Sequence, residues 1–453
     1  MTGQLMSKSY HCWMSALKKL QPKRHVVIWL AIPLALIGSF FTTRADGFHG
    51  WMPLFSIPVY FIIVAGTLRL APKSHKLEKN FKTQNFIEKS QQRSKRDLLL
   101  LLRFFAASLV FTMHSRIVFG ESPQHLFGRS SWFFYSPAWL GMAIFFTLSG
   151  YLMGKVFATN RYSVNRSGIH KFYVSRFLRI VPSSCFVTLI LLTYLYPAWW
   201  TNLKFVLRIF TFTFNGINGP GGFGAFWSLT TEMQFYMLVP ALALICKNKL
   251  KNNKMIIIAL IVAYALGSGI RLASALHYGG GFKYWNPYIY TPLYENLDLF
   301  LGGFLLSQLD LTRFQTFKKA ARSLWPLLLV ITYLFYDRVS WLATVNSKHL
   351  AIGFFIVLLP GVASIMTLIL IIGMEHSSST WKKESRFWAP IINYLGPLTF
   401  CYYMLHSSIM ISIQQTFPNF SYIVKLLISL PLVLALSSFV YYGIESKFHK
   451  SSK

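Results

Sequence analysis

The stretch DLLLLLRFFAASLVFTMHSRIVF, residues 97–119, decides the fold class. It is long enough to cross a lipid bilayer, which needs about 20 mostly apolar residues. It also carries Arg103 and His114 within the apolar run. Ionisable side chains inside a bilayer are costly, so each of them is a candidate functional residue. The stretch therefore indicates a membrane protein and one place where its chemistry would lie.

The composition of the whole chain supports a membrane protein. The 453 residues are 54% hydrophobic and 17% aromatic, and only 13% are charged. Hydrophobicity this high excludes a disordered chain and argues against a soluble domain. The net charge of +32 would suit a nucleic-acid binder, but Lys and Arg lie in short clusters between long apolar runs. The four cysteines lack metal-ligand spacing, so we predict no metal site and no disulfide framework.

Twelve stretches of the chain are candidate membrane helices. We predict an all-α polytopic bundle with two parts: residues 1–96, with two helices and a basic cytoplasmic loop, and a ten-helix core at 97–453. We expect the first span to be retained as a helix rather than cleaved as a signal peptide. The spans are roughly 26–43, 53–71, 97–119, 137–158, 182–200, 226–246, 255–276, 290–309, 323–336, 349–374, 391–413 and 422–444.

Prolines and one short run give details of these helices. Pro182 and Pro390 should each begin a helix, because proline is tolerated in the first turn. Pro240 and Pro360 should kink the sixth and tenth helices or leave carbonyl groups free. The ninth span, 323–336, is short for a full crossing.

The distribution of basic residues predicts the orientation. With the N-terminus in the cytoplasm and twelve alternating spans, 33 of the 45 Lys and Arg residues lie on the cytoplasmic side and nine on the outer side. Cytoplasmic loops of membrane proteins carry such an excess of positive charge. We therefore expect a multi-pass membrane protein with both termini in the cytoplasm.

Arg103 and His114 should lie on one face of their helix. Their spacing of eleven residues corresponds to about 1100°, or three turns plus about 20°, and to about 16 Å along the axis. The predicted orientation places Arg103 in the inner half and His114 in the outer half. Taken singly, Arg103 could extend to the inner interface and His114 could be a polar packing contact. Their shared face favours a functional role.

The segment FWSLTTEMQFY, residues 226–236, opens the sixth span from the outer side. Ser228 and Glu232 are four residues apart and so share a helix face. The alternative is that Ser228 or Thr231 caps the helix and Glu232 only complements its dipole. Near the outer face, Glu295 and Asp298 could form an acid pair or hold Arg271 or Lys283.

A pair of arginines, Arg176 and Arg179, lies beside the membrane on the cytoplasmic side. Three residues apart, they would be neighbours on a helix and could hold phosphate groups. The alternative is that they only contribute to the positive charge of the cytoplasmic side.

Seven motifs in order resemble acyltransferase family 3, the membrane O-acyltransferases of bacterial surface glycans. The resemblance covers about 97–450. The chain departs from the family in having Ser175 before the arginine pair and two extra N-terminal helices, and it shows no C-terminal hydrolase domain of the SGNH type. The motifs are Arg103-x10-His114, FFTLSGYL at 145–152, Arg176-x-x-Arg179, WSLTTEMQFY at 227–236, FLGG at 300–303, YMLH at 403–406 and YYGIE at 441–445.

The resemblance implies an enzyme that moves an acyl group, expected to be acetyl, from cytoplasmic acyl-CoA to a hydroxyl of an extracytoplasmic glycan. Lipopolysaccharide O-antigen and exopolysaccharide are examples of such acceptors. The resemblance also implies a location in the bacterial inner membrane, and no cofactor beyond the acyl-CoA substrate is expected. The catalytic residues would be His114 and Glu232. The substrate-binding residues would be Arg103, Arg176, Arg179, Ser228, Tyr236 and His406.

A transporter is the competing class of protein. Intramembrane charges and broken helices also mark transport paths, as in an exporter of a lipid-linked glycan. The sequence shows no paired halves with breaks at matching positions, which argues against that class.

Overall fold

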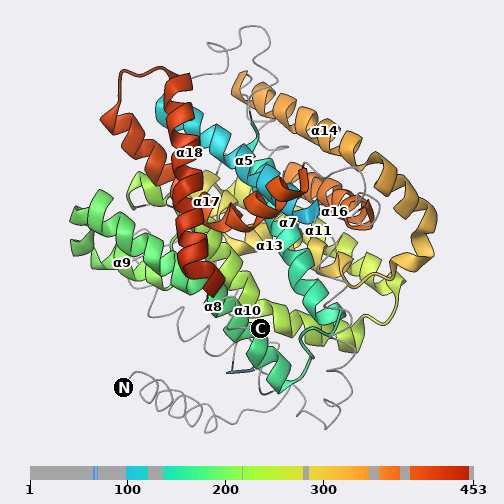
Figure 1. Cartoon of the computed structure of the whole chain (residues 1–453). Helices are drawn as coiled ribbons and strands as arrows, with labels where there is room; N and C mark the ends of the chain where they lie inside the picture. The colour runs from blue at the N-terminus through green and yellow to red at the C-terminus, as the bar shows by residue number, and fades with distance from the viewer. Residues whose placement is uncertain are drawn as a thin grey trace.

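The structure, a computed structural model, describes residues 65–66, 69, 98–120, 136–216, 218–278, 285–345, 357–377 and 388–447. Within these residues the chain is helical and contains no strands (Figure 1). The helices of eight or more residues are α5 (Leu98–Phe119), α7 (Ala138–Ala158), α8 (Arg166–Ile190), α9 (Leu203–Phe210), α10 (Phe226–Lys249), α11 (Asn253–Tyr278), α13 (Leu293–Leu306), α14 (Gln315–Val345), α16 (Leu359–Ser377), α17 (Trp388–Thr416) and α18 (Tyr422–Val440).

Seven of the described helices are long and apolar enough to cross a membrane. They are α5, α7, α8, α10, α11, α16 and α18. Apart from 65, 66 and 69, the first two predicted spans lie outside the described residues. The all-helical membrane fold is therefore confirmed, whereas the count of twelve and the division after residue 96 stay predictions.

One prediction for the proline-containing helices was wrong. Pro182 does not begin a helix but lies inside α8, which begins at Arg166. The Asn165 side chain accepts a hydrogen bond from the Gly168 backbone N–H at 2.8 Å, so a polar cap starts this helix well before the apolar run. Pro360 is the second residue of α16, and a turn at Leu358 interrupts the helical structure just before it, as expected for a proline.

The start of a helix predicted at Pro390 agrees with the structure, whereas the kink at Pro240 stays a prediction. Pro240 lies inside α10, and Pro390 lies in the first turn of α17. The predicted ninth span, 323–336, is only the middle of the 31-residue α14. The apolar run underestimated this helix because its first turns carry exposed polar residues such as Lys319 and Arg322.

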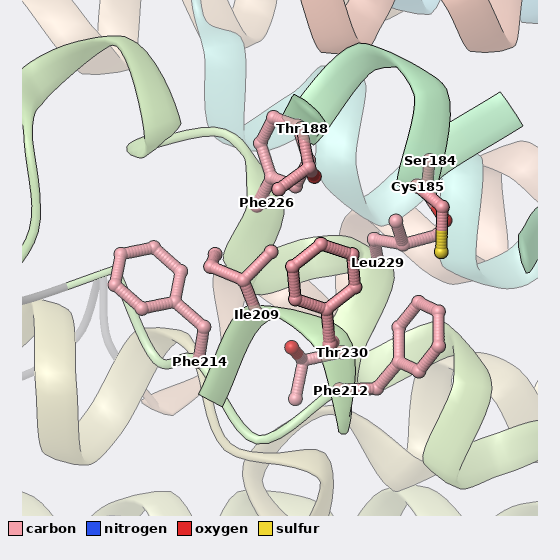
Figure 2. Close-up of a pocket in the computed structure, with 10 residues that line it drawn as sticks. Ser184, Cys185, Thr188, Ile209, Phe212, Phe214, Phe226, Leu229 and Thr230 are labelled. Atoms are coloured by element: carbon pink, nitrogen blue, oxygen red, sulfur yellow. The ribbon is translucent and has the colours of Figure 1, made fainter. Parts of the chain in front are cut away.

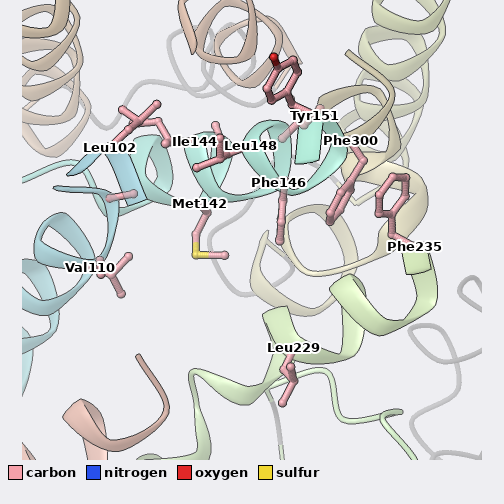
Figure 3. Packing of buried hydrophobic residues seen from close by; sticks show 14 of the residues in the cluster. Leu102, Val110, Met142, Ile144, Phe146, Leu148, Tyr151, Leu229, Phe235 and Phe300 are labelled. Atoms are coloured by element: carbon pink, nitrogen blue, oxygen red, sulfur yellow. The ribbon is translucent and has the colours of Figure 1, made fainter. Parts of the chain in front are cut away.

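Helix α7 lies at the centre of the bundle and packs against α5, α10, α13 and α16 (Figure 1). The Phe146, Phe235 and Phe300 rings from α7, α10 and α13 form one stack (Figure 3), with centroids 4.6 and 4.3 Å from that of Phe300. Gly150 and Gly303 let the backbones of α7 and α13 approach closely, since a Cβ atom at either would overlap the other helix. On the other side of α7, α5 packs against α17, which also packs against α18.

Candidate active site

A cavity that is partly open to the surface lies among α5, α7, α8, α10 and α17, and its empty space of about 720 Å³ includes that open part. Five of the eight residues predicted for the site line it: Arg103, Arg179, Ser228, Glu232 and Tyr236. They come from three helices that are far apart in the sequence. The rest of its wall is largely apolar and aromatic, as in many small-molecule sites.

Two guanidinium groups face this cavity. Within the part of the chain that the structure describes, Arg103 and Arg179 have no hydrogen bond or ion pair with a protein group, although both are partly buried. A guanidinium carries five N–H donors, which suit phosphate and carboxylate oxygens. Both arginines therefore keep their donors available for an anionic ligand.

Arg176 takes a different position from Arg179. It is buried, with its guanidinium 5.7 Å from the centre of the Phe172 ring and its Nη1 3.7 Å from the Met153 sulfur. It is not among the residues that line the cavity. The structure therefore brings Arg179, and not Arg176, to the cavity wall.

The Glu232 carboxylate is held by two hydroxyl groups. The Ser149 hydroxyl donates a 2.8 Å hydrogen bond to Oε1, and the Tyr236 hydroxyl donates to the same oxygen. The two hydroxyls are 3.2 Å apart. Oε2 has no hydrogen-bond partner among the described residues, so one carboxylate oxygen is fixed while the other can receive a substrate group.

His114 and His406 form a second polar group beside this cavity. The His114 Nδ1 lies 2.8 Å from the His406 Nε2, and the two rings are stacked with centroids 5.0 Å apart. The His406 Nδ1 lies 2.6 Å from the Tyr403 carbonyl oxygen. The Tyr403 hydroxyl is hydrogen-bonded to that of Ser228 at 2.9 Å, and both of these residues line the cavity. Tyr403 thus connects the histidine pair to the cavity wall.

A smaller apolar cavity of about 290 Å³ adjoins the first one (Figure 2). Phe226 and Leu229 line both cavities. Its remaining wall includes Ile209, Phe212 and Phe214 and contains no charged side chain. This cavity is therefore lined by apolar and small polar side chains and offers no opposite charge to an ion.

Three residues with contacts at the site were not predicted: Ser149, Tyr403 and Met142. Ser149 lies in the FFTLSGYL motif and Tyr403 in the YMLH motif, so position within these motifs was the available signal. No feature of the sequence marked Met142 as a site residue, because a methionine in an apolar run looks like any other core residue. Its sulfur lies 3.5 Å from the Tyr403 hydroxyl.

Comparisons with known proteins identify the family of this chain. A family model described as "Acyltransferase domain" matches residues 99–442, which is more than half of the chain. Peptidoglycan O-acetyltransferase OatA of Listeria monocytogenes serovar 1/2a (strain ATCC BAA-679 / EGD-e) is 27% identical over 169 residues, covering 34% of this chain and 25% of that protein. The chain thus matches only a quarter of that relative's length.

No solved structure matches the chain. The family match extends over the motifs from α5 to the segment that follows α18. It decides between the two classes that the sequence left open, in favour of an enzyme over an exporter. The chain is a multi-pass membrane protein that belongs to acyltransferase family 3.

Proposed function

We propose that this acyltransferase moves an acetyl group from cytoplasmic acetyl-CoA to a hydroxyl of an extracytoplasmic glycan, such as lipopolysaccharide O-antigen or exopolysaccharide. One observation carries the proposal. Two arginines without a hydrogen-bonded partner among the described residues, a carboxylate with one open oxygen and Ser228 line a single cavity beside a histidine pair. The listerial relative is named as an O-acetyltransferase of a glycan, peptidoglycan, which supports the same reaction class.

Arg103 and Arg179 would bind the donor. Coenzyme A carries phosphate groups, and charge-assisted hydrogen bonds from guanidinium groups suit them. Burial of Arg176 on Phe172 supports a role for that residue in holding α8 rather than in contacting the donor. In the proposed orientation, with both termini in the cytoplasm, the arginines lie toward the cytoplasmic side and His114 toward the outer side.

The hydrogen bonds of the histidine pair support His114 as the general base. A carbonyl oxygen can only accept, so the His406 Nδ1 carries a proton and donates it to the Tyr403 carbonyl. In the neutral ring the His406 Nε2 then accepts from the His114 Nδ1. The unprotonated nitrogen of His114 is therefore Nε2, and this atom would take the proton of the acceptor hydroxyl.

The reaction forms one bond and breaks one. The sugar oxygen bonds to the acetyl carbon, and the bond from that carbon to the CoA sulfur breaks. The hydroxyl proton goes to the His114 Nε2, which returns it to the leaving thiolate. A positioned base of this kind contributes about 10²–10⁴-fold.

Glu232 has a separate role in this scheme. It makes no hydrogen bond to His114, whose ring is oriented by His406 instead. Its open Oε2 would accept a hydrogen bond from the acceptor hydroxyl and so orient it for attack. Ser228 and Tyr236 support the site through their bonds to Tyr403 and Glu232.

Acetate measurement on intact cells tests the proposal. Surface polysaccharide is purified from producing cells and from cells lacking this gene, then saponified, and the released acetate is measured per unit of polymer. We expect the deletion to lose ester-linked acetate with polymer yield unchanged, and His114→Ala to behave like the deletion. Loss of the polymer with unchanged acetate per unit would overturn the proposal in favour of export.

A further inference from the structure

A second cavity, partly open to the surface, lies on the other side of Met142 from the catalytic cavity, and its empty space of about 430 Å³ includes that open part. Met142 lines both spaces, and its sulfur is 3.5 Å from the Tyr403 hydroxyl. Figure 3 shows the Met142 side chain projecting from α7. A methionine is unbranched and adaptable, so it forms a yielding wall between the two spaces.

Glu295 gives this second cavity an unused acceptor. Its side chain is buried, with 1% of the residue exposed, and it lines the cavity. Oε1 accepts a hydrogen bond from the Ser274 hydroxyl. Oε2 is buried and has no hydrogen-bond partner among the described residues. A buried carboxylate oxygen left unpaired is costly, which points to a ligand that supplies a donor.

The neighbouring arginine does not fill this role. Arg271 binds both carboxylate oxygens of Asp298, at 2.9 and 2.7 Å. It also donates to the backbone carbonyl groups of Glu295 and Val357, at 2.7 and 3.1 Å. Its guanidinium is thus committed to other groups, and the Glu295 Oε2 stays available.

The remaining wall suits a sugar. Trp139 and Tyr290 contribute aromatic rings, on which the C–H faces of a pyranose can pack. The Trp139 indole N–H donates to the Ser340 hydroxyl at 3.1 Å, which holds the ring in place. Asn296 donates through Nδ2 to the carbonyl groups of Tyr290 and Pro292 and so keeps its amide in a fixed position beside the cavity.

We propose that this second cavity binds the acceptor sugar and that the Glu295 Oε2 accepts a hydrogen bond from one of its hydroxyls. The inference rests on the proposed function, because only a glycan acceptor requires such a site. The sugar would lie against Met142, with its reacting hydroxyl directed past that side chain toward Glu232 and His114. Glu295 is then a substrate-binding residue that determines acceptor specificity.

Steady-state kinetics with purified protein separate the acceptor from the donor. The assay uses radiolabelled acetyl-CoA and saponified surface polysaccharide from producing cells. We expect Glu295→Gln to raise the KM for polysaccharide about 10-fold, the size of one hydrogen bond, with the KM for acetyl-CoA unchanged. The matched control is Glu375→Gln, a carboxylate bound instead by Tyr151 and Lys155, which should leave both constants unchanged.

A second variant and a labelling measurement keep the test decisive if Glu295→Gln does not fold. Ala143→Leu adds volume inside the same cavity and should also raise the KM for polysaccharide. In the wild-type protein, polysaccharide should protect Glu295 from modification by dicyclohexylcarbodiimide, read by peptide mass spectrometry. Unchanged KM values in a folded variant, or Glu295 labelling that is absent or unprotected, overturn the acceptor site. A wild-type protein that transfers no acetyl group overturns the proposed function itself.

Discussion

His114 and His406 lie 292 positions apart in the sequence and are joined by a 2.8 Å hydrogen bond between Nδ1 of one and Nε2 of the other. The bond connects α5 to α17, two helices that also approach closely at Gly396 and Leu100. The tautomer of His114 is therefore set by a helix from the other end of the core. His406 is a positioning residue for the base, and its own Nδ1 is fixed by the Tyr403 carbonyl.

Removal of either histidine should lower kcat with little change in KM. His114→Ala removes the base and should lower kcat about 10²–10⁴-fold. His406→Ala leaves the base but frees its ring, so a smaller loss is expected, with both KM values unchanged. The double variant should be no slower than His114→Ala, because residues that act as one unit are not additive. A double variant whose loss in kcat equals the product of the two single losses would show that the two histidines act independently.

Replacing either cavity arginine should weaken the binding of a donor that carries phosphate groups but not of a donor that lacks them. Arg103→Ala and Arg179→Ala should each raise the KM for acetyl-CoA by about 10-fold, since each removes charge-assisted hydrogen bonds. With S-acetylpantetheine, which lacks phosphate groups, the same variants should match the wild type. The control is Arg313→Ala, whose exposed side chain is 3.8 Å from Asp310 and remote from the cavity lining. An equal loss with both donors would contradict phosphate binding.

Hydropathy and helical periodicity predicted much of this molecule. The run at 97–119 corresponds to α5 within one residue, and 137–158 corresponds to α7 equally well. These segments are apolar because they face lipid or core along their whole length. The α14 helix exceeded its apolar run because exposed polar ends continue a helix without adding hydropathy.

Side-chain partners between distant helices could not be predicted. Spacing indicated that Arg176 and Arg179 would be neighbours, but only tertiary packing decides that Arg176 meets Phe172 while Arg179 lines the cavity. Spacing likewise put Arg103 and His114 on one helix face, yet gave no sign of the His406 ring. The prediction for Asp298 was partly right, since Arg271 was one of the basic residues expected to pair with Glu295 or Asp298.

The buried ion pair between Arg271 and Asp298 should be costly to break on one side only. Arg271→Met leaves the Asp298 carboxylate buried and unpaired, for which about 3–5 kcal/mol of destabilisation is typical. The double variant Arg271→Met/Asp298→Leu removes both charges and should melt above either single variant. The unfolding temperatures of the double variant and of the two single variants are compared in detergent micelles. A double variant whose loss equals the sum of the two single losses would show that the charges do not stabilise each other.

Close packing of α7 on α13 should be the most sensitive contact in the core. A Cβ atom at Gly150 would overlap the Phe300 backbone oxygen, and neither backbone can move without disturbing the stacked phenylalanines. Gly150→Ala should therefore lower the unfolding temperature in detergent and reduce the yield of folded protein. Gly269 in α11 provides the matched control, because a Cβ there meets no atom within 4 Å. Gly269→Ala should be neutral or slightly stabilising, by up to about 1 kcal/mol, because alanine favours helix over glycine. Equal melting of the two variants would mean that α7 and α13 do not pack through this glycine.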